Sequence, residues 1–147
     1  PMTKVNATAD PDYPAAEAIA LARDAVAAFP QAAMFEVRDR GFGSVFQQLV
    51  ACVISIRTRD EDSLPASLRL FDAAPEPAAL AALDAATIAD LIAPSSFREE
   101  KAPRIREIAR RTAGEFGGEL PCDGDVLRGF AGVGPKCANL ALGVACG

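Results

Sequence analysis

The sequence lacks histidine and tryptophan altogether, and its aromatic residues are eight phenylalanines and one tyrosine. Without histidine, the chain cannot form the Ser–His or Cys–His pairs of nucleophilic catalysis, nor a histidine-ligated metal site. It also lacks an apolar run approaching the ~20 residues that a membrane-spanning helix needs, and its first residues contain no apolar core typical of a secretory signal. We therefore expect a cytoplasmic protein that does not bind membranes, with residues 1–13 as a disordered leader.

Cysteine is scarce and scattered. The four cysteines, Cys52, Cys122, Cys137 and Cys146, include no CxxC pair. Three of them lie inside apolar helical patterns, where cysteine usually packs as a small buried side chain. Since nothing in the chain indicates export, the sequence predicts reduced thiols and no metal site among them.

Segments typical of β-strands are also missing, because alanine and leucine are abundant and runs of valine, threonine and tyrosine are rare. Half of the residues are hydrophobic, and 147 residues are enough to bury the core of one domain. Apolar residues recur at helical spacing along most of the chain. The sequence therefore predicts an all-α fold, a compact multi-helix domain.

Capping residues and glycines predict where the helices begin and end. A first helix is expected over residues 14–30. The next one, VFQQLVACVISI, follows the N-cap Ser44 and is apolar on nearly all sides, so it should be buried. Asp60 is the expected N-cap of the helix after it, and Gly117 with Gly118 should end a longer helix. Further helices are expected near residues 77–83, 87–92, 105–116, 123–130 and 134–147.

The stretch GFAGVGPKCANLAL at residues 129–142 is typical of a helix-hairpin-helix, here spanning residues 123–146. Gly132, Val133 and Gly134 form the expected turn, and Pro135 suits the first turn of the following helix. Free N–H groups at that helix start, together with the helix dipole, favour a bound anion such as a DNA phosphate. The alternative is an ordinary turn between two helices with no ligand.

The net charge of −5 argues mildly against a nucleic-acid partner. Residues 98–111 depart from it, because they contain more basic than acidic side chains, and we assign Lys101 within them to DNA binding. The alternative is a solvated helix face. The basic residues are Arg98, Lys101, Arg104, Arg106, Arg110 and Arg111, against Glu99, Glu100 and Glu107.

From about residue 42 to residue 147 the chain resembles the endonuclease III family, the helix-hairpin-helix DNA glycosylases and AP lyases of base-excision repair. The resemblance rests on FQQLVACVISIRTRD at 46–60, SSFREEKAPRI at 95–105 and GELPCDGDVLRGFAGVGPKCANLAL at 118–142, in the order and at the spacing of the family. It implies a helical DNA-binding domain over residues 42–147. It also implies that the helix at 14–30 packs with a C-terminal part absent from this chain.

The family resemblance also implies roles for single residues. Lys136, directly after the hairpin glycines, matches the lysine that attacks the sugar C1′. Arg57 and Phe97 match two wedge residues that fill the space of an extruded base. An essential aspartate and the cysteines of a 4Fe–4S cluster match positions beyond Gly147, so no cofactor is expected within this chain. Alternatively, Lys136 is a solvated helix residue, Arg57 pairs with nearby acids, and Phe97 belongs to the core.

These observations predict a base-excision repair glycosylase with AP lyase activity, which removes damaged bases, oxidised pyrimidines in particular, and nicks the strand by β-elimination. Its expected partner is duplex DNA containing damaged bases or abasic sites, and we expect a monomer at the nucleoid. One alternative is a catalytically defective helix-hairpin-helix relative that only binds DNA. Another is a helical protein–protein module.

Overall fold

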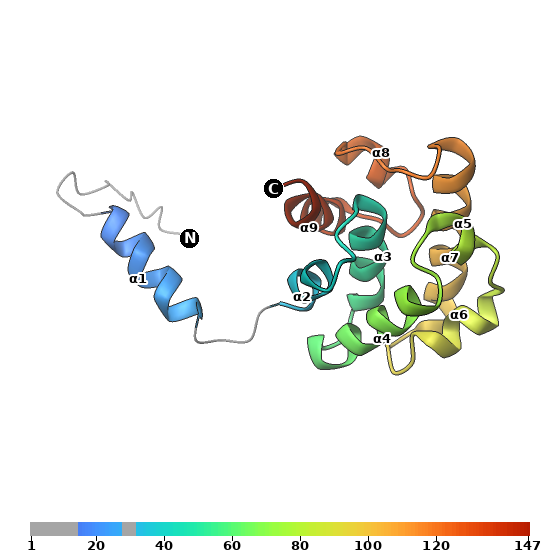
Figure 1. Cartoon of the computed structure of the whole chain (residues 1–147), viewed down its shortest axis with the longest axis horizontal. Helices are drawn as coiled ribbons and strands as arrows, with labels where there is room; N and C mark the ends of the chain where they lie inside the picture. Colours follow the sequence, from blue (N-terminus) through green and yellow to red (C-terminus); the bar gives the residue numbers. More distant parts are fainter. Residues whose placement is uncertain (1–14, 28–31) are drawn as a thin grey trace, which may run out of the picture. The chain divides into compact units, whose positions relative to one another are not determined.

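The computed structural model describes residues 15–27 and 32–147, and the regular structure in these ranges is helical throughout, which confirms the predicted all-α fold (Figure 1). The chain divides into two units, Pro1–Gln31 and Ala32–Gly147. The described helices are α1 (Ala15–Ala27), α2 (Ala33–Asp39), α3 (Val45–Ser55), α4 (Asp60–Ala73), α5 (Pro77–Ala81), α6 (Ala85–Leu91), α7 (Arg98–Glu115), α8 (Gly124–Arg128) and α9 (Pro135–Cys146).

In the first unit, α1 confirms a helix within the predicted range of 14–30. The expected disordered leader at residues 1–13 and the end of the predicted helix at 28–30 lie outside the described residues. None of the helices described is both long and apolar enough to cross a membrane.

In the second unit, α3 is the central element, as its apolar composition predicts. Ser44 is its N-cap: the Ser44 hydroxyl accepts from the N–H of Gln47, and the Gln47 side chain accepts from the N–H of Ser44. This reciprocal pair satisfies two donors at the helix start and fixes where α3 begins. Nearly every residue of α3 is buried, because α2, α4, α7 and α9 pack around it (Figure 1).

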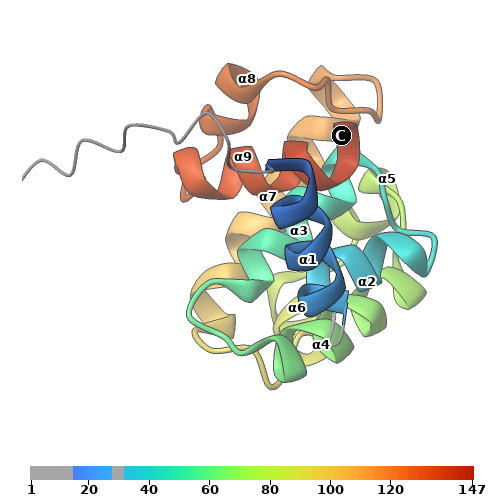
Figure 2. The same cartoon turned by 90° about the vertical axis from the view of Figure 1, so that its left-hand side faces the viewer.

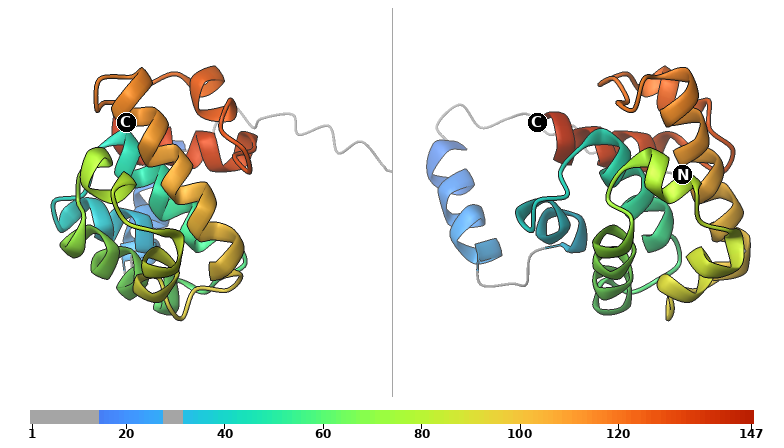
Figure 3. Two further views of the ribbon diagram at one scale, coloured as in Figure 1. Left: turned by 90° about the vertical axis from the view of Figure 1, so that its right-hand side faces the viewer. Right: turned by 45° about the vertical axis from the view of Figure 1, so that its right-hand side comes forward.

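Helix α7 runs beside α3 and carries α5 and α6 on its flank (Figure 3). It begins at Arg98, several residues before the predicted start near 105. Its end matches the prediction: Gly117 and Gly118 have φ of +63° and +90°, and the N–H of Gly118 donates to the carbonyl of Thr112. Glycine tolerates this left-handed backbone, which turns the chain out of the helix.

Two features of the second unit differ from the prediction. Helix α2 was not predicted, because it is short and its N-cap, Ala32, offers no capping side chain. Asp60 is not an N-cap: Arg59 occupies that position, and Asp60 is the first residue of α4. The Asp60 carboxylate instead accepts a hydrogen bond from the N–H of Ala33, 3.2 Å away. A side chain of α4 thus satisfies the open start of α2.

The prediction of reduced thiols is wrong for Cys122 and Cys146, which form a disulfide with a Cα–Cα distance of 6.3 Å. The chain path through α8 and α9 brings the segment before α8 against the end of α9, which the spacing of the cysteines alone does not reveal. Cys52 and Cys137 are free and buried, as expected for small apolar side chains.

Candidate functional site

The predicted helix-hairpin-helix is present, with α8 and α9 packed together at one end of the unit (Figure 2). Asp123 caps α8 through a hydrogen bond from the N–H of Asp125. The turn passes through Gly132, whose φ of +82° lies in the region that favours glycine. The Val133 side chain is buried, and its N–H donates to the carbonyl of Phe130 at 3.2 Å. Val133 therefore anchors the turn from inside.

The start of α9 is an open helix end. Gly134 is the N-cap and Pro135 the first helical residue, and no side chain accepts a hydrogen bond from the N–H groups of the first turn. Such a start presents free N–H donors and the positive end of the helix dipole. Lys136 is exposed in this same turn. The arrangement suits an anion held by backbone groups, with an amine beside it.

A pocket of about 400 Å³ brings Lys136 together with α3. The hairpin glycines 132 and 134 form one side, and the C-terminal end of α3 and the loop after it form the other. We name residues 56–59 the first wedge loop. The lining residues are Cys52, Ser55, Ile56, Arg57, Gly132, Gly134, Lys136, Cys137 and Leu140.

The two buried thiols, Cys52 and Cys137, both line this pocket. The hydrogen bond between them lowers the pKa of Cys52 and raises that of Cys137. With Cys122 and Cys146 joined to each other, the four cysteines do not fit the thiolate set of an iron–sulfur cluster.

A second pocket, of about 240 Å³, also has Arg57 in its lining. We name residues 92–97, between α6 and α7, the second wedge loop. The Arg57 guanidinium carbon is 5.8 Å from the centroid of the Phe97 ring, within the range of a cation–π contact. The structure thus brings the two predicted wedge residues together. The lining residues are Val53, Ile56, Arg57, Phe97, Glu100, Lys101 and Arg104.

Both wedge residues have a left-handed backbone. Arg57 has φ +53° and Phe97 has φ +57°, and no other non-glycine residue in ranges 15–27 and 32–147 has a positive φ. Each such residue carries a strain of about 1 kcal/mol, and strain of this kind clusters at functional sites. Phe97 is 54% exposed, which excludes the alternative that it belongs to the core.

The ion pairs of the first wedge loop belong to Arg59 and not to Arg57. Within the described part of the chain, the Arg59 guanidinium lies 3.0 Å from Glu61 and 3.5 Å from Asp62. The alternative that Arg57 pairs with these acids is therefore not what the structure shows. Its side chain faces the Phe97 ring instead.

Lys101, which we assigned to DNA binding, is buried with only 3% of its surface exposed. Its ammonium donates to the carbonyls of Ile54 and Ile56 and to the hydroxyls of Thr58 and Ser95. Burial lowers the pKa of this lysine to about 8. A buried ammonium with these partners does not reach a DNA phosphate, so the assignment is corrected: Lys101 acts inside the protein.

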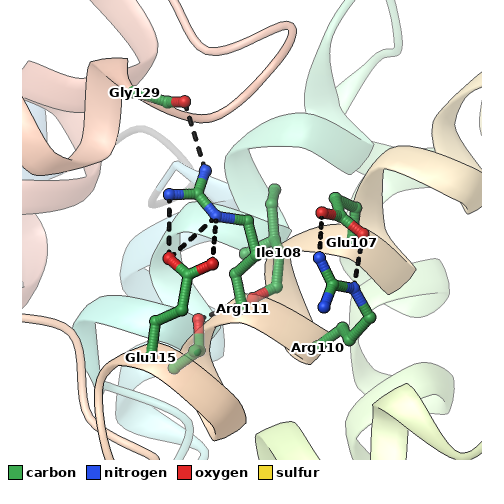
Figure 4. A network of polar contacts seen from close by, with 7 residues as sticks. Glu107, Ile108, Arg110, Arg111, Glu115 and Gly129 are labelled. Carbon is green, nitrogen blue, oxygen red and sulfur yellow. Dashed lines mark hydrogen bonds and ion pairs between the residues drawn. The ribbon is translucent and has the colours of Figure 1, made fainter.

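Two arginines near the end of the basic segment pair with glutamates of α7 (Figure 4). Arg110 pairs with Glu107, and Arg111 pairs with Glu115 while also donating to the carbonyl of Gly129. The Arg111 guanidinium carbon also lies 4.6 Å from the centroid of the Phe130 ring. These contacts support the reading of a solvated helix face, on which Arg111 braces the hairpin.

Arg104, a member of the basic segment, lines the second pocket and also lies close to the hairpin. A Cβ atom added at Gly132 would come within 3.0 Å of the Arg104 side chain. Arg104 therefore joins Arg57 and Lys136 as a candidate for DNA contact.

An uncapped hairpin helix, a lysine beside it and a strained wedge loop across the pocket define a helix-hairpin-helix domain. Residues 50–136 match the family described as HhH-GPD superfamily base excision DNA repair protein. The chain belongs to this family.

Among its relatives, endonuclease III of Thermotoga maritima is 37% identical over 124 residues, covering 84% of this chain and 55% of the relative. Endonuclease III of Escherichia coli is 31% identical over 109 residues, covering 74% of this chain and 52% of the relative. The chain therefore spans about half the length of the curated relatives it matches.

Solved structures of endonuclease III on DNA have the same fold. A trapped endonuclease III–DNA covalent intermediate is matched with a TM-score of 0.66 and 28% identity, over 70% of this chain and 48% of that one. A non-covalent endonuclease III–DNA complex is matched with a TM-score of 0.65 and 27% identity, over 69% of this chain and 48% of that one.

Proposed function

We propose that this chain carries the lysine and the DNA-binding hairpin of a base-excision DNA glycosylase with AP lyase activity. The observation that carries the proposal is the pocket of about 400 Å³ in which Lys136, the hairpin glycines and Arg57 come together. Its substrate is duplex DNA containing a damaged base, oxidised pyrimidines in particular, or an abasic site. The match to a family of base excision DNA repair proteins supports damaged DNA as the substrate.

The hairpin binds the DNA backbone. The open N–H groups at the start of α9 donate to a phosphate, and Gly134, which has no side chain, lets the DNA backbone approach closely. Such a contact fixes the position of the protein on DNA without reading sequence. Binding should therefore weaken as the salt concentration rises.

Lys136 supplies the chemistry. As a neutral amine, its Nζ lone pair attacks the sugar C1′, the bond from C1′ to the base breaks, and the base leaves with the bonding electrons. The C1′–O4′ bond then breaks, O4′ takes the electron pair and the proton that Nζ loses, and an iminium forms between C1′ and Nζ. The iminium acidifies a C2′ proton, and the loss of that proton expels the 3′ phosphate by β-elimination. The similarity to a trapped endonuclease III–DNA covalent intermediate supports a covalent step of this kind.

Arg57 and Phe97 hold the DNA open. Extruding a nucleotide leaves a space in the stack, and unstacking costs a few kcal/mol in order of magnitude. The exposed Phe97 ring can stack in that space, and the Arg57 guanidinium can stack or donate to the unpaired base. Their contact across the second pocket supports a joint action.

Borohydride trapping on an oligonucleotide with one abasic site tests the proposal, with the full-length protein. Lys136→Arg is the informative variant, because it keeps the positive charge but provides no nucleophilic amine. We expect the parent to form a covalent adduct and Lys136→Arg to bind the same DNA without forming it. An equal yield of adduct from Lys136→Arg would refute the assignment.

Borohydride trapping, combined with a measurement of duplex binding at several salt concentrations, separates the alternatives. Salt-dependent DNA binding without an adduct from the parent protein would identify a catalytically defective DNA-binding relative. No salt-dependent binding to duplex DNA would favour the protein–protein module.

A further inference from the structure

The Lys101 ammonium joins the two wedge loops from inside. It lies 2.8 Å from the carbonyl oxygen of Ile54 and 2.6 Å from that of Ile56, at the end of α3. It also lies 3.1 Å from the Thr58 hydroxyl and 2.9 Å from the Ser95 hydroxyl. Ile56 and Thr58 belong to the first wedge loop and Ser95 to the second. One charged group from α7 therefore holds segments that are far apart in the sequence.

The acceptors on α3 explain why a cation is needed here. The last carbonyls of a helix have no partner within the helix, and the C-terminal end of the helix dipole is negative. The Ile54 carbonyl accepts from Lys101 and from the Ser95 hydroxyl, and the Ile56 carbonyl accepts from Lys101 and from the Thr58 hydroxyl. Lys101 thus caps α3 from another helix.

The two hydroxyls complete the connection between the loops. Thr58 accepts from the N–H of Ser96 at 3.0 Å as well as from Lys101. Arg57 therefore lies between two residues, Ile56 and Thr58, that are each bonded to the ammonium. Phe97 follows Ser95 and Ser96 closely, and its own carbonyl accepts from the N–H of Lys101 at 3.0 Å. Both strained residues are thus flanked by this network.

We propose that Lys101 is a positioning residue for base extrusion: its ammonium fixes the wedge loops so that the Arg57 and Phe97 side chains stand ready to enter the DNA stack. This inference rests on the proposed wedge function of these two residues. It assigns Lys101 no contact with DNA and no part in the chemistry at Lys136.

A fluorescence experiment tests the loop order without DNA, so it does not depend on the proposed function. The 147-residue chain has no tryptophan, so Phe97→Trp creates a single reporter in the second wedge loop. In this background, Lys101→Met keeps the apolar stem but removes the donors. We expect greater acrylamide quenching and lower anisotropy of Trp emission with Lys101→Met. Unchanged quenching and anisotropy in a folded Lys101→Met chain would overturn the proposal.

Ile108→Ala is the matched control, because Ile108 is a buried residue of α7 and makes no hydrogen bond to the wedge loops through its side chain. It lowers stability by loss of packing. Ile108→Ala should leave the reporter unchanged at temperatures where both variants are folded. If it disturbs the reporter as strongly as Lys101→Met does, the effect is general loosening and the proposal fails.

The functional arm uses the full-length protein and 2-aminopurine fluorescence beside a lesion. Lys101→Met should slow base extrusion by about tenfold or more, because Arg57 and Phe97 are no longer held in position to fill the space left by the extruded base. Borohydride trapping on an abasic site, which has no base to extrude, should change much less. Slow extrusion with intact trapping supports the proposal, whereas equal losses in both contradict it. If the parent protein neither extrudes a base nor forms a trapped adduct, the proposed function is refuted. The tryptophan fluorescence result still tests whether Lys101 orders the wedge loops.

Thr58→Val provides a milder version if Lys101→Met does not fold. It removes the hydroxyl that links Ser96 to Lys101. Thr58 is only half-buried, so this change should disturb the core less than Lys101→Met does. It should change the reporter and the extrusion rate in the same direction as Lys101→Met, by a smaller factor. A folded Thr58→Val chain with neither change would overturn the proposal.

Discussion

The Arg57 guanidinium carbon lies 5.8 Å from the centroid of the Phe97 ring, and both residues have a left-handed backbone. Each residue ends or begins a helix where glycine would be the less strained choice. The two strained positions carry the side chains that the proposed wedge function needs. This combination leads to the first prediction.

Replacing Arg57 or Phe97 by glycine should separate stability from function. Each change relieves a positive φ, so the free energy of unfolding should stay the same or rise by up to about 1 kcal/mol. Base extrusion should nevertheless slow, because the wedge side chain is gone. Urea unfolding and 2-aminopurine kinetics measure the two effects. Arg106→Gly, within α7, serves as the control and should lose about 1 kcal/mol. A clear loss of stability for Arg57→Gly would show that the backbone there is unstrained.

The two hairpin glycines should respond differently to alanine. Gly132 has φ +82°, and a Cβ there meets the Arg104 side chain at 3.0 Å, so Gly132→Ala should destabilise the fold by about 1–2 kcal/mol. Gly134 has an ordinary φ and open space around an added Cβ, so Gly134→Ala should unfold like the parent. Because the Cβ occupies the approach of a phosphate, Gly134→Ala should still weaken duplex binding in a fluorescence anisotropy titration. Parent-like binding by Gly134→Ala would place the phosphate elsewhere.

Lys101 should make stability rise with pH on the alkaline side. Burial lowers its pKa from 10.5 to about 8 in the folded chain. Below pH about 8 the group is charged in both states, and folding bears the penalty of burying the charge. Between about 8 and 10.5 the unfolded chain binds more protons, so the free energy of unfolding increases with pH.

The difference in unfolding free energy between the parent and Lys101→Met isolates this effect from the titration of the cysteines. It should grow in favour of the parent by at most about 3 kcal/mol over that pH window, at about 1.4 kcal/mol for each pKa unit. Urea titrations at several pH values measure it. A difference that stays constant across the window would mean that the four acceptors hold the pKa near its ordinary value.

The disulfide between Cys122 and Cys146 should stabilise the hairpin unit. It closes a sequence separation of 24 residues that contains α8, the turn and α9. Reduction should lower the free energy of unfolding by about 3 kcal/mol, because a loop of this length restricts the unfolded chain. Thermal unfolding with and without dithiothreitol measures the change. A Cys122→Ser/Cys146→Ser variant should be insensitive to the reductant, and a similar loss in that variant would point to an effect of reductant elsewhere.

The features that sequence reasoning predicted correctly depend on local physics. The capping box at Ser44 and Gln47 and the all-round apolar pattern of α3 lie within one segment, as do the glycines that end α7. The hairpin is likewise contained in a single short stretch. Such signals need no knowledge of distant contacts.

The features that it missed depend on distant partners. Lys101 looks like a surface cation in the sequence, and its burial follows only from the open carbonyls at the end of α3. The same is true of Asp60, whose partner is the start of α2, and of the Cys122–Cys146 pair. The placement of Arg104 beside Gly132 also required the packing of α7 against the hairpin.

Ile56 and Arg57 line both pockets of the site, so these two residues form a shared wall. A molecule that moves Arg57 when it enters one pocket therefore changes the shape and charge of the other. Thermodynamic linkage requires this influence to be equal in both directions. If a base bound near Lys136 changes the affinity of the pocket beside Phe97 by some factor, then binding beside Phe97 changes the affinity for that base by the same factor. In the proposed function, the site beside Lys136 and the site beside Phe97 are therefore energetically coupled, and Arg57 is a residue that both pockets share.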